Sequence, residues 1–206
     1  MICEIFLAFQ LTYALVLNPK KLADIYWMFR ATLTTGLFLS CHGYRECLPL
    51  LDTGYFVSND FATVLKIVVL LTVIFLFAVI SRSGSELPFM MTLATLFLLL
   101  LLSSSHFMAT FFALVGLSLN LYVLVLFDAS YAASREAALK YYYLSVISSG
   151  FILYGIFIIF VACGSLSFDD IAVFTALCHS DDTMRMGLGL LLLGFFFKLS
   201  AFPGHQ

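Results

Sequence analysis

The sequence predicts an all-α, polytopic membrane protein with about seven transmembrane helices, the last of which breaks near Pro203. Of its 206 residues, 63% are hydrophobic and only 11% are charged, far less charge than a soluble domain of this size carries. The apolar residues come in runs that are long enough to cross a bilayer as helices. These runs lack the alternation that is typical of strands, and a helix satisfies its own backbone hydrogen bonds in lipid.

Seven apolar segments follow one another along the chain. They cover approximately residues 2–17, 24–40, 60–80, 88–104, 106–127, 135–162 and 184–203. The loops between them hold almost all of the charged residues. No positively charged region precedes the first segment, so we expect a retained helix there rather than a cleaved signal peptide.

Charge and cysteine spacing exclude several kinds of site. The net charge is −2, and basic residues are not interleaved with aromatic ones, so we expect no nucleic-acid partner. None of the five cysteines has the spacing of a metal or iron–sulfur site. A glycine-rich dinucleotide fingerprint after a strand is also missing. We therefore expect no metal site, no catalytic residue and no cofactor bound by this chain.

The sixth segment carries Lys140 one to two turns inside its first end. A cation at this depth in a bilayer is costly and usually marks an ion or proton path. Alternatively, Lys140 reaches the headgroups by snorkelling, and the sequence leaves both explanations open. Glu136 lies four residues earlier and shares a helix face with Lys140. For Arg30 and Lys66, in the second and third segments, snorkelling is the explanation we expect.

The last segment carries Lys198 well inside its length, one turn before Pro203. Proline removes a backbone donor and clashes with the preceding turn, and Gly204 adds backbone freedom, so a break is predicted here. Backbone freed at membrane depth usually borders a hydrated cavity. Lys198 could exchange protons with that water, or it could hold the kink by binding freed carbonyl groups.

Four blocks of sequence resemble, in the right order, the antiporter-like membrane-arm subunits of respiratory complex I, the proton-pumping NADH–ubiquinone oxidoreductase, and most closely the chain 2 members of that family. The blocks are Asn-Asp-Phe-Ala at 59–62 with Leu-Lys at 65–66, residues 103–122, Glu-Ala-Ala-Leu-Lys-Tyr at 136–141 with 149–155 and 164–168, and Gly-Phe-Phe-Phe-Lys-Leu-Ser-Ala-Phe-Pro at 194–203 with His205. The resemblance covers residues 59–206. It divides the chain into two amino-terminal helices with their loop, 1–58, and the amino-terminal part of a proton-channel domain, 59–206.

The resemblance implies functional roles. Lys140 and Lys198 would be the proton-path residues of the sixth and seventh helices, and Glu136, Lys66 and His205 would support them. The chain would be a non-redox subunit of an H⁺-translocating NADH:ubiquinone reductase, with NADH, FMN, iron–sulfur clusters and ubiquinone bound elsewhere in the complex. Its partners would be other membrane-arm subunits and lipids. Phenylalanine, at 23 of 206 residues, suggests an organellar gene, so we expect the mitochondrial inner membrane rather than a bacterial inner membrane.

Two departures from the family pattern bear on this reading. An acidic residue on the fifth helix normally pairs with the lysine at Lys140, but Val115 occupies the expected position and cannot titrate. The family also continues with further helices where this sequence stops at Gln206. We expect a second polypeptide to supply that carboxy-terminal half, because a lone half would expose the broken helix to lipid. A truncated sequence would look the same.

The predicted function is proton translocation coupled to NADH:ubiquinone electron transfer, through Lys140 and Lys198. Two alternatives stay open. In one, the chain is a structural spacer whose channel is silenced by Val115. In the other, it is a subunit of a multi-subunit cation/proton antiporter.

Overall fold

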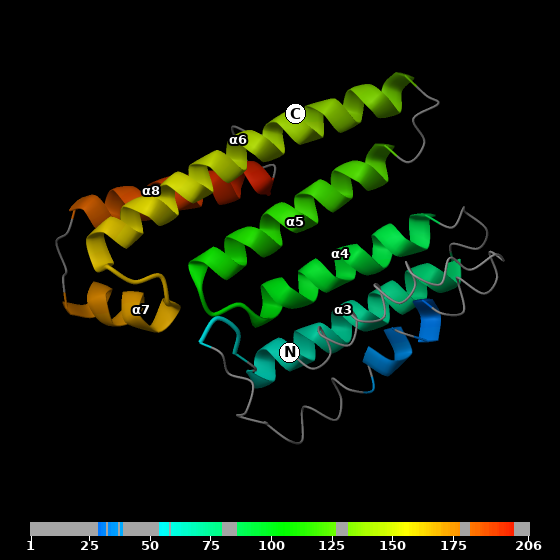
Figure 1. The fold of residues 1–206 in the computed structure, drawn as a ribbon, viewed down its shortest axis with the longest axis horizontal. Coiled ribbons are helices and arrows are strands. Elements are labelled where there is room, and N and C mark those ends of the chain that lie inside the picture. The colour runs from blue at the N-terminus through cyan, green and yellow to red at the C-terminus, as the bar shows by residue number, and fades with distance from the viewer. Residues whose placement is uncertain are drawn as a thin grey trace. The chain divides into compact units, whose positions relative to one another are not determined.

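The computed structural model describes residues 29–31, 33–36, 38, 54–57, 59–79, 86–126, 132–177 and 182–199. These ranges are helical apart from short links and isolated bridges, which confirms the all-α class (Figure 1). The labelled helices are α3 (Asp60–Val79), α4 (Glu86–Ser103), α5 (Phe107–Val125), α6 (Ala132–Cys163), α7 (Phe168–Leu177) and α8 (Asp182–Lys198).

Three of these helices contain a stretch that is long and apolar enough to cross a membrane. The stretches are Asp60–Phe77, Phe107–Val125 and Ala133–Cys163, and the apolar stretch Leu87–Ser103 of α4 is shorter. They confirm an all-α membrane protein. The first predicted segment and the predicted break at Pro203 lie outside the described residues, so the count of seven helices and the break itself stay predictions.

The chain forms two compact units, Met1–Ser104 and Ser105–Gln206. Helices α3 and α4 belong to the first unit, and α5 to α8 belong to the second. The predicted division between residues 58 and 59 rests on the family resemblance and stays a prediction.

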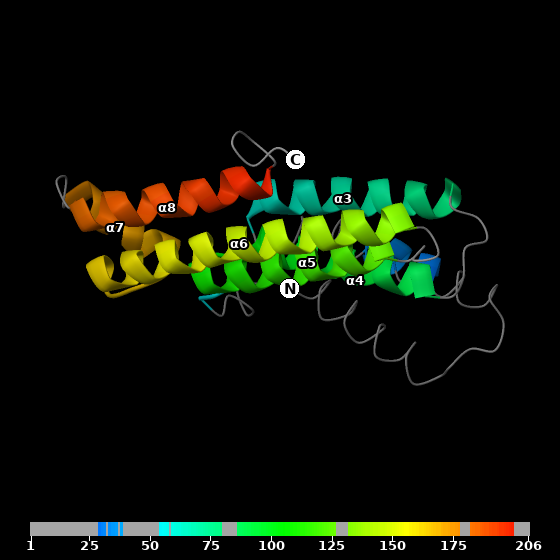
Figure 2. The same ribbon diagram turned by 90° about the horizontal axis from the view of Figure 1, so that it is seen from above.

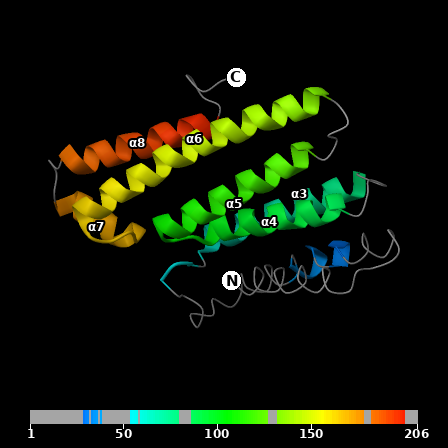
Figure 3. The same cartoon turned by 45° about the horizontal axis from the view of Figure 1, so that its top comes forward.

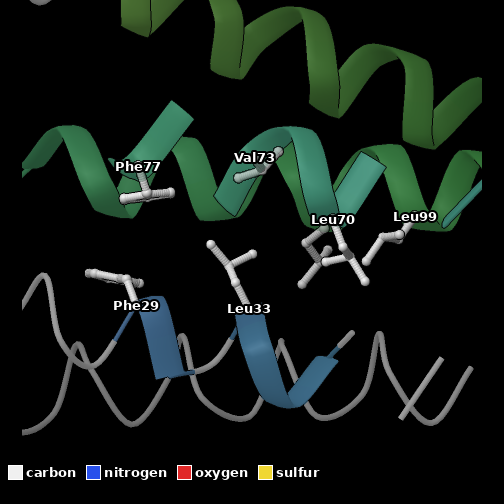
Figure 4. Packing of buried hydrophobic residues seen from close by; sticks show 7 residues of the cluster. Phe29, Leu33, Leu70, Val73, Phe77 and Leu99 are labelled. Atoms are coloured by element: carbon white, nitrogen blue, oxygen red, sulfur yellow. The ribbon is translucent and has the colours of Figure 1, made fainter. Parts of the chain in front are cut away.

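In the first unit, one stripe of α3 packs against α4 and the helical residues around Leu33. Leu70, Val73 and Phe77 recur at helical spacing on this stripe and are all buried. Figure 4 shows them facing Phe29, Leu33 and Leu99 in one cluster. Lipid tails are as apolar as these side chains, so in a bilayer close van der Waals packing, rather than water exclusion, holds the helices together. At one end of the unit, the amide of Val57 donates to the carbonyl of Ser103 over 2.9 Å.

In the second unit, α6 and α8 lie side by side (Figure 2). Glycines allow the close approach. A Cβ atom at Gly194 would lie 2.6 Å from Cγ1 of Ile152 and 3.0 Å from the carbonyl oxygen of Ser148. A Cβ atom at Gly155 would likewise lie 2.8 Å from the backbone nitrogen of Leu191. The two backbones are therefore nearly in contact, as small residues permit between membrane helices.

Helix α5 packs against another face of α6, as Figure 3 shows. Helix α6 ends at Cys163 because Gly164 takes a positive φ of 74°, and its amide donates to the carbonyl of Phe160 over 2.8 Å. The chain then runs antiparallel to the start of α5 through a bridge between His106 and Ser167.

The short helix α7 was not predicted, because its ten residues fall in a region that we expected to be a loop. The hydroxyl of Ser167 accepts a hydrogen bond from the amide of Asp170 over 3.3 Å and so caps the helix. Ile171 is buried in the core of the second unit. The pattern Ser-x-x-Asp at 167–170 followed by apolar residues was a signal that could have indicated this helix.

Candidate functional site

Lys198 is the last residue of α8, and its ammonium reaches the backbone of α5. Its Nζ donates a hydrogen bond to the carbonyl oxygen of Leu114 over 3.1 Å, in a part-buried position. The close packing of α8 on α6 at Gly194, one turn earlier, brings the lysine there. This contact joins the end of one helix to the middle of another inside the apolar part of the unit.

Val115 occupies the position on α5 where the family resemblance implies an acid paired with Lys140. The structure places Lys198 against Leu114, the residue next to Val115. The residues of α6 beside Val115 include Tyr142, and Lys140 is turned by about 200° from Tyr142 around the helix axis.

Lys140 pairs with Glu136 instead. Its Nζ lies 2.8 Å from Oε1 of Glu136, one turn earlier on the same helix. The two side chains are 66% and 69% exposed in the described chain. This pair was considered in the sequence as a substitute for the missing acid, and the structure shows its geometry but not a role in transport.

A small cavity of about 40 Å³ lies between α5 and α6 beside Val115. Its lining residues are Val115, Ser118, Leu119, Tyr122, Tyr142, Ser145, Val146 and Ser149. The hydroxyl of Ser118 donates to the carbonyl of Val115 over 2.9 Å, and the rings of Tyr122 and Tyr142 lie with centroids 5.2 Å apart. The described lining therefore provides hydroxyl groups and apolar walls but no carboxylate.

Lys66 lies in the first unit and is only 4% exposed. The expectation that it snorkels away from the protein interior is wrong, because it lies on the buried stripe of α3 one turn before Leu70. The hydropathy of the sequence did not show whether Lys66 faces the lipid or the protein interior, since both sides of α3 are otherwise apolar. Arg30, in contrast, is exposed.

Pro203, Gly204 and His205 lie outside the described residues, so the predicted helix break and the supporting role of His205 stay predictions. The described part of α8 ends at Lys198, with the amide of Leu199 donating to the carbonyl of Phe195 over 2.9 Å. Within the described ranges, no group of three or more His, Cys, Asp or Glu side chains gathers to hold a metal ion.

Sequence reasoning missed the carbonyl of Leu114. A backbone acceptor leaves no mark in the residue types, so no sequence signal could have shown it. The glycines at 187 and 194, seven residues apart, were a usable signal for the face of α8 that packs on α6.

The fold and these lysines define a class: a polytopic helical membrane protein with basic side chains inside its helix packing, an arrangement typical of ion-translocating proteins. Residues 104–206, half of the chain, match the family model described as NADH:quinone oxidoreductase/Mrp antiporter, transmembrane. The chain belongs to this family.

Curated relatives agree with that assignment. The chain is 34% identical over 160 residues to NADH-quinone oxidoreductase subunit N 1 of Rhizobium meliloti, covering 74% of this chain and 33% of the relative. It is 30% identical over 189 residues to subunit N of Nitrosomonas europaea, covering 88% and 39%. The chain thus spans well under half the length of these relatives.

Solved structures show the same fold. Respiratory complex I from Thermus thermophilus contains a chain that matches with a TM-score of 0.80 at 23% identity, over 98% of this chain and 45% of that chain. A chain of the archaeal membrane-bound sulfane sulfur reductase matches with a TM-score of 0.85 at 16% identity, over 99% and 45%. A chain of the Mrp complex from Dietzia matches with a TM-score of 0.76 at 18% identity, over 98% and 41%.

Proposed function

We propose that this chain is a non-redox, proton-translocating membrane-arm subunit of a complex I-type NADH:quinone oxidoreductase. The observation that carries the proposal is the hydrogen bond between Lys198 and the carbonyl of Leu114 inside the helix packing. The names of the curated relatives, subunits N of NADH-quinone oxidoreductases, support the choice of complex.

In the proposed mechanism, Lys198 alternates between two states. In one state the ammonium donates to the carbonyl of Leu114. In the other, an Nζ–H bond has broken, the proton has passed to the oxygen of a water molecule, and the electron pair remains on Nζ as the neutral amine. A neutral carbonyl can hold an ammonium through a hydrogen bond without fixing it as tightly as a carboxylate would, because no opposite full charge is present. Lys140 and Glu136 form an ion pair on the exposed side of α6, and the proposal places the entry or exit of protons at this side of the unit.

The proposed partners are other membrane-arm subunits, lipids, and a second polypeptide that supplies the carboxy-terminal half. No cofactor is proposed for this chain; NADH, FMN, iron–sulfur clusters and ubiquinone would bind elsewhere in the complex. The relatives compared above are bacterial. The placement in a mitochondrial rather than a bacterial inner membrane therefore stays a prediction from composition.

The experiment that tests the proposal is replacement of Lys198 by Met in the assembled complex. Methionine keeps an unbranched apolar chain but cannot carry a proton. We expect normal assembly and a lower number of protons moved per NADH oxidised, measured with a pH-sensitive dye in closed membrane vesicles. An unchanged ratio would remove Lys198 from the proton path.

A subunit of a cation/proton antiporter is the second candidate, since the matching family model covers Mrp antiporters and the Mrp complex of Dietzia shares the fold. The composition of the purified particle separates the two. Redox subunits in the same particle support the oxidoreductase, and their absence together with sodium/proton exchange supports the antiporter. The third candidate, a spacer with a silenced channel, is favoured by Val115, and it predicts that no lysine replacement changes proton movement.

A further inference from the structure

A groove of about 720 Å³ runs along one face of α6, beside the start of α5. Gly150, Tyr154, Phe157 and Phe160 of α6 line it at helical spacing, and Met108 of α5 lines it too. Apart from the hydroxyl of Tyr154, the described side chains that line the groove are apolar. The groove therefore offers no charge and almost no hydrogen bond to a water-soluble ligand, and it fits an apolar one.

The groove has the depth of one leaflet of the bilayer. The membrane-crossing stretch of α6 ends at Cys163, and the exposed acidic residues Asp169 and Asp170 of α7 follow, so this end of α6 lies near the membrane surface. Phe160 and Gly150 are ten residues apart, which is about 15 Å along the helix axis. The hydrocarbon core is about 30 Å thick, so each leaflet contributes about 15 Å. The groove therefore begins near the surface and ends near the middle of the bilayer.

Both the length and the volume favour a lipid acyl chain over a helix of another protein as the occupant. A helix that crosses the membrane would follow α6 through both leaflets, but the groove ends at Gly150. A helix segment about 10 Å wide and 15 Å long fills roughly 1,200 Å³, more than the 720 Å³ of the groove. An acyl chain runs through one leaflet only, and it is thin enough to reach the buried side chain of Ile156 on the floor of the groove.

We propose that this groove holds one acyl chain of a phospholipid, bound from the leaflet next to α7. Gly150 keeps the inner end of the groove open, because a Cβ atom at this residue would meet no heavy atom within 4 Å. Side chains that face an unfilled space lose van der Waals contacts, and a bound acyl chain supplies those contacts. The inference goes beyond the proposed function, since an acyl chain in this groove is compatible with an oxidoreductase and with an antiporter.

The test uses the assembled complex in vesicles of phosphatidylcholine that carries a diazirine at the end of one acyl chain. The complex is then purified in detergent with an excess of unlabelled phosphatidylcholine, irradiated, and mapped by peptide mass spectrometry. Lipids that only surround the protein exchange during this step, so labelling elsewhere on the complex should be lost. Labelling of α6 around Gly150 should persist, because the end of the bound chain lies there. Loss of the α6 label with the others would overturn the proposal, and so would a groove that is unlabelled before the exchange because another protein covers it.

A replacement of Gly150 tests the groove itself. Gly150→Leu should fill the inner end without a clash and reduce the persistent labelling of α6 several-fold. The matched control is Gly189→Leu on α8, where a Cβ atom also meets open space and where the described lining of the groove does not extend. Both variants replace a helical glycine by leucine and so gain the same helix propensity. Equal labelling of the two variants would overturn the proposal, and if Gly150→Leu does not assemble, the exchange experiment on the wild type decides.

Discussion

The ammonium of Lys198 donates to the carbonyl oxygen of Leu114 over 3.1 Å, directly beside Val115. A charged group on α8 is thus held by the backbone of α5, at the position where the family resemblance implies an acidic side chain nearby. The contact depends on how closely α8 approaches α6.

The first prediction concerns that approach. Gly194→Ala puts a methyl group against Ile152 and the backbone of Ser148, which cannot move aside cheaply, so α8 must shift and carry Lys198 away from Leu114. We expect lower thermal stability and lower proton movement per NADH. Gly189→Ala on the same helix meets open space and serves as the control. Equal behaviour of the two variants in a melting experiment and in the vesicle assay would show that the close contact does not position the lysine.

The second prediction restores an acid. Val115→Glu places a carboxylate beside the α5–α6 cavity and one residue from the carbonyl that holds Lys198. We expect the variant to assemble, because an ion pair with Lys198 can compensate for the lost hydration of the carboxylate. The double variant Val115→Glu with Lys198→Met should be less stable, since its buried carboxylate has lost that partner. The measurement is a double-mutant cycle by thermal melting, and additive effects would mean that the two positions do not interact.

The third prediction concerns Lys140 and Glu136. Both side chains are mostly exposed, and exposed ion pairs contribute little to stability. Glu136→Gln should therefore leave the melting temperature nearly unchanged at moderate ionic strength. A large drop would show that this pair is covered by another subunit in the complete protein.

Most of the helices could be predicted from the sequence, for a physical reason. Apolar runs of membrane-crossing length indicated α3, α5 and α6 to within about three residues at each end, because length and hydropathy alone determine such spans. The rotation of each helix about its axis could not be predicted. Both lipid and protein interior accept apolar residues, so nothing in the sequence indicated that Lys66 faces inward while Lys140 faces away from α5.

The capping of α7 gives a fourth prediction, outside the membrane-spanning helices. The hydroxyl of Ser167, and after it that of Ser165, lowers the pKa of the Asp170 carboxyl by stabilising its charged form. Ser167→Ala should raise that pKa back toward its ordinary value and remove the helix cap, at a cost of about 1 kcal/mol. A lowered pKa stabilises the folded state above the unfolded-state value and loses this effect as the pH falls through the folded-state value. The wild-type advantage over Ser167→Ala should therefore shrink in acid, and an NMR titration of Asp170 with melting curves at several pH values checks both effects.

The most direct test of the central claim is the number of protons moved per NADH in complexes that carry Lys198→Arg. Arginine keeps the positive charge and can still donate to the carbonyl of Leu114, but it does not release its proton. If Lys198 carries protons, this variant should assemble with near-normal stability and move fewer protons per NADH than the wild type. A wild-type ratio in the assembled variant would contradict the account, because the contact with Leu114 would then be structural only.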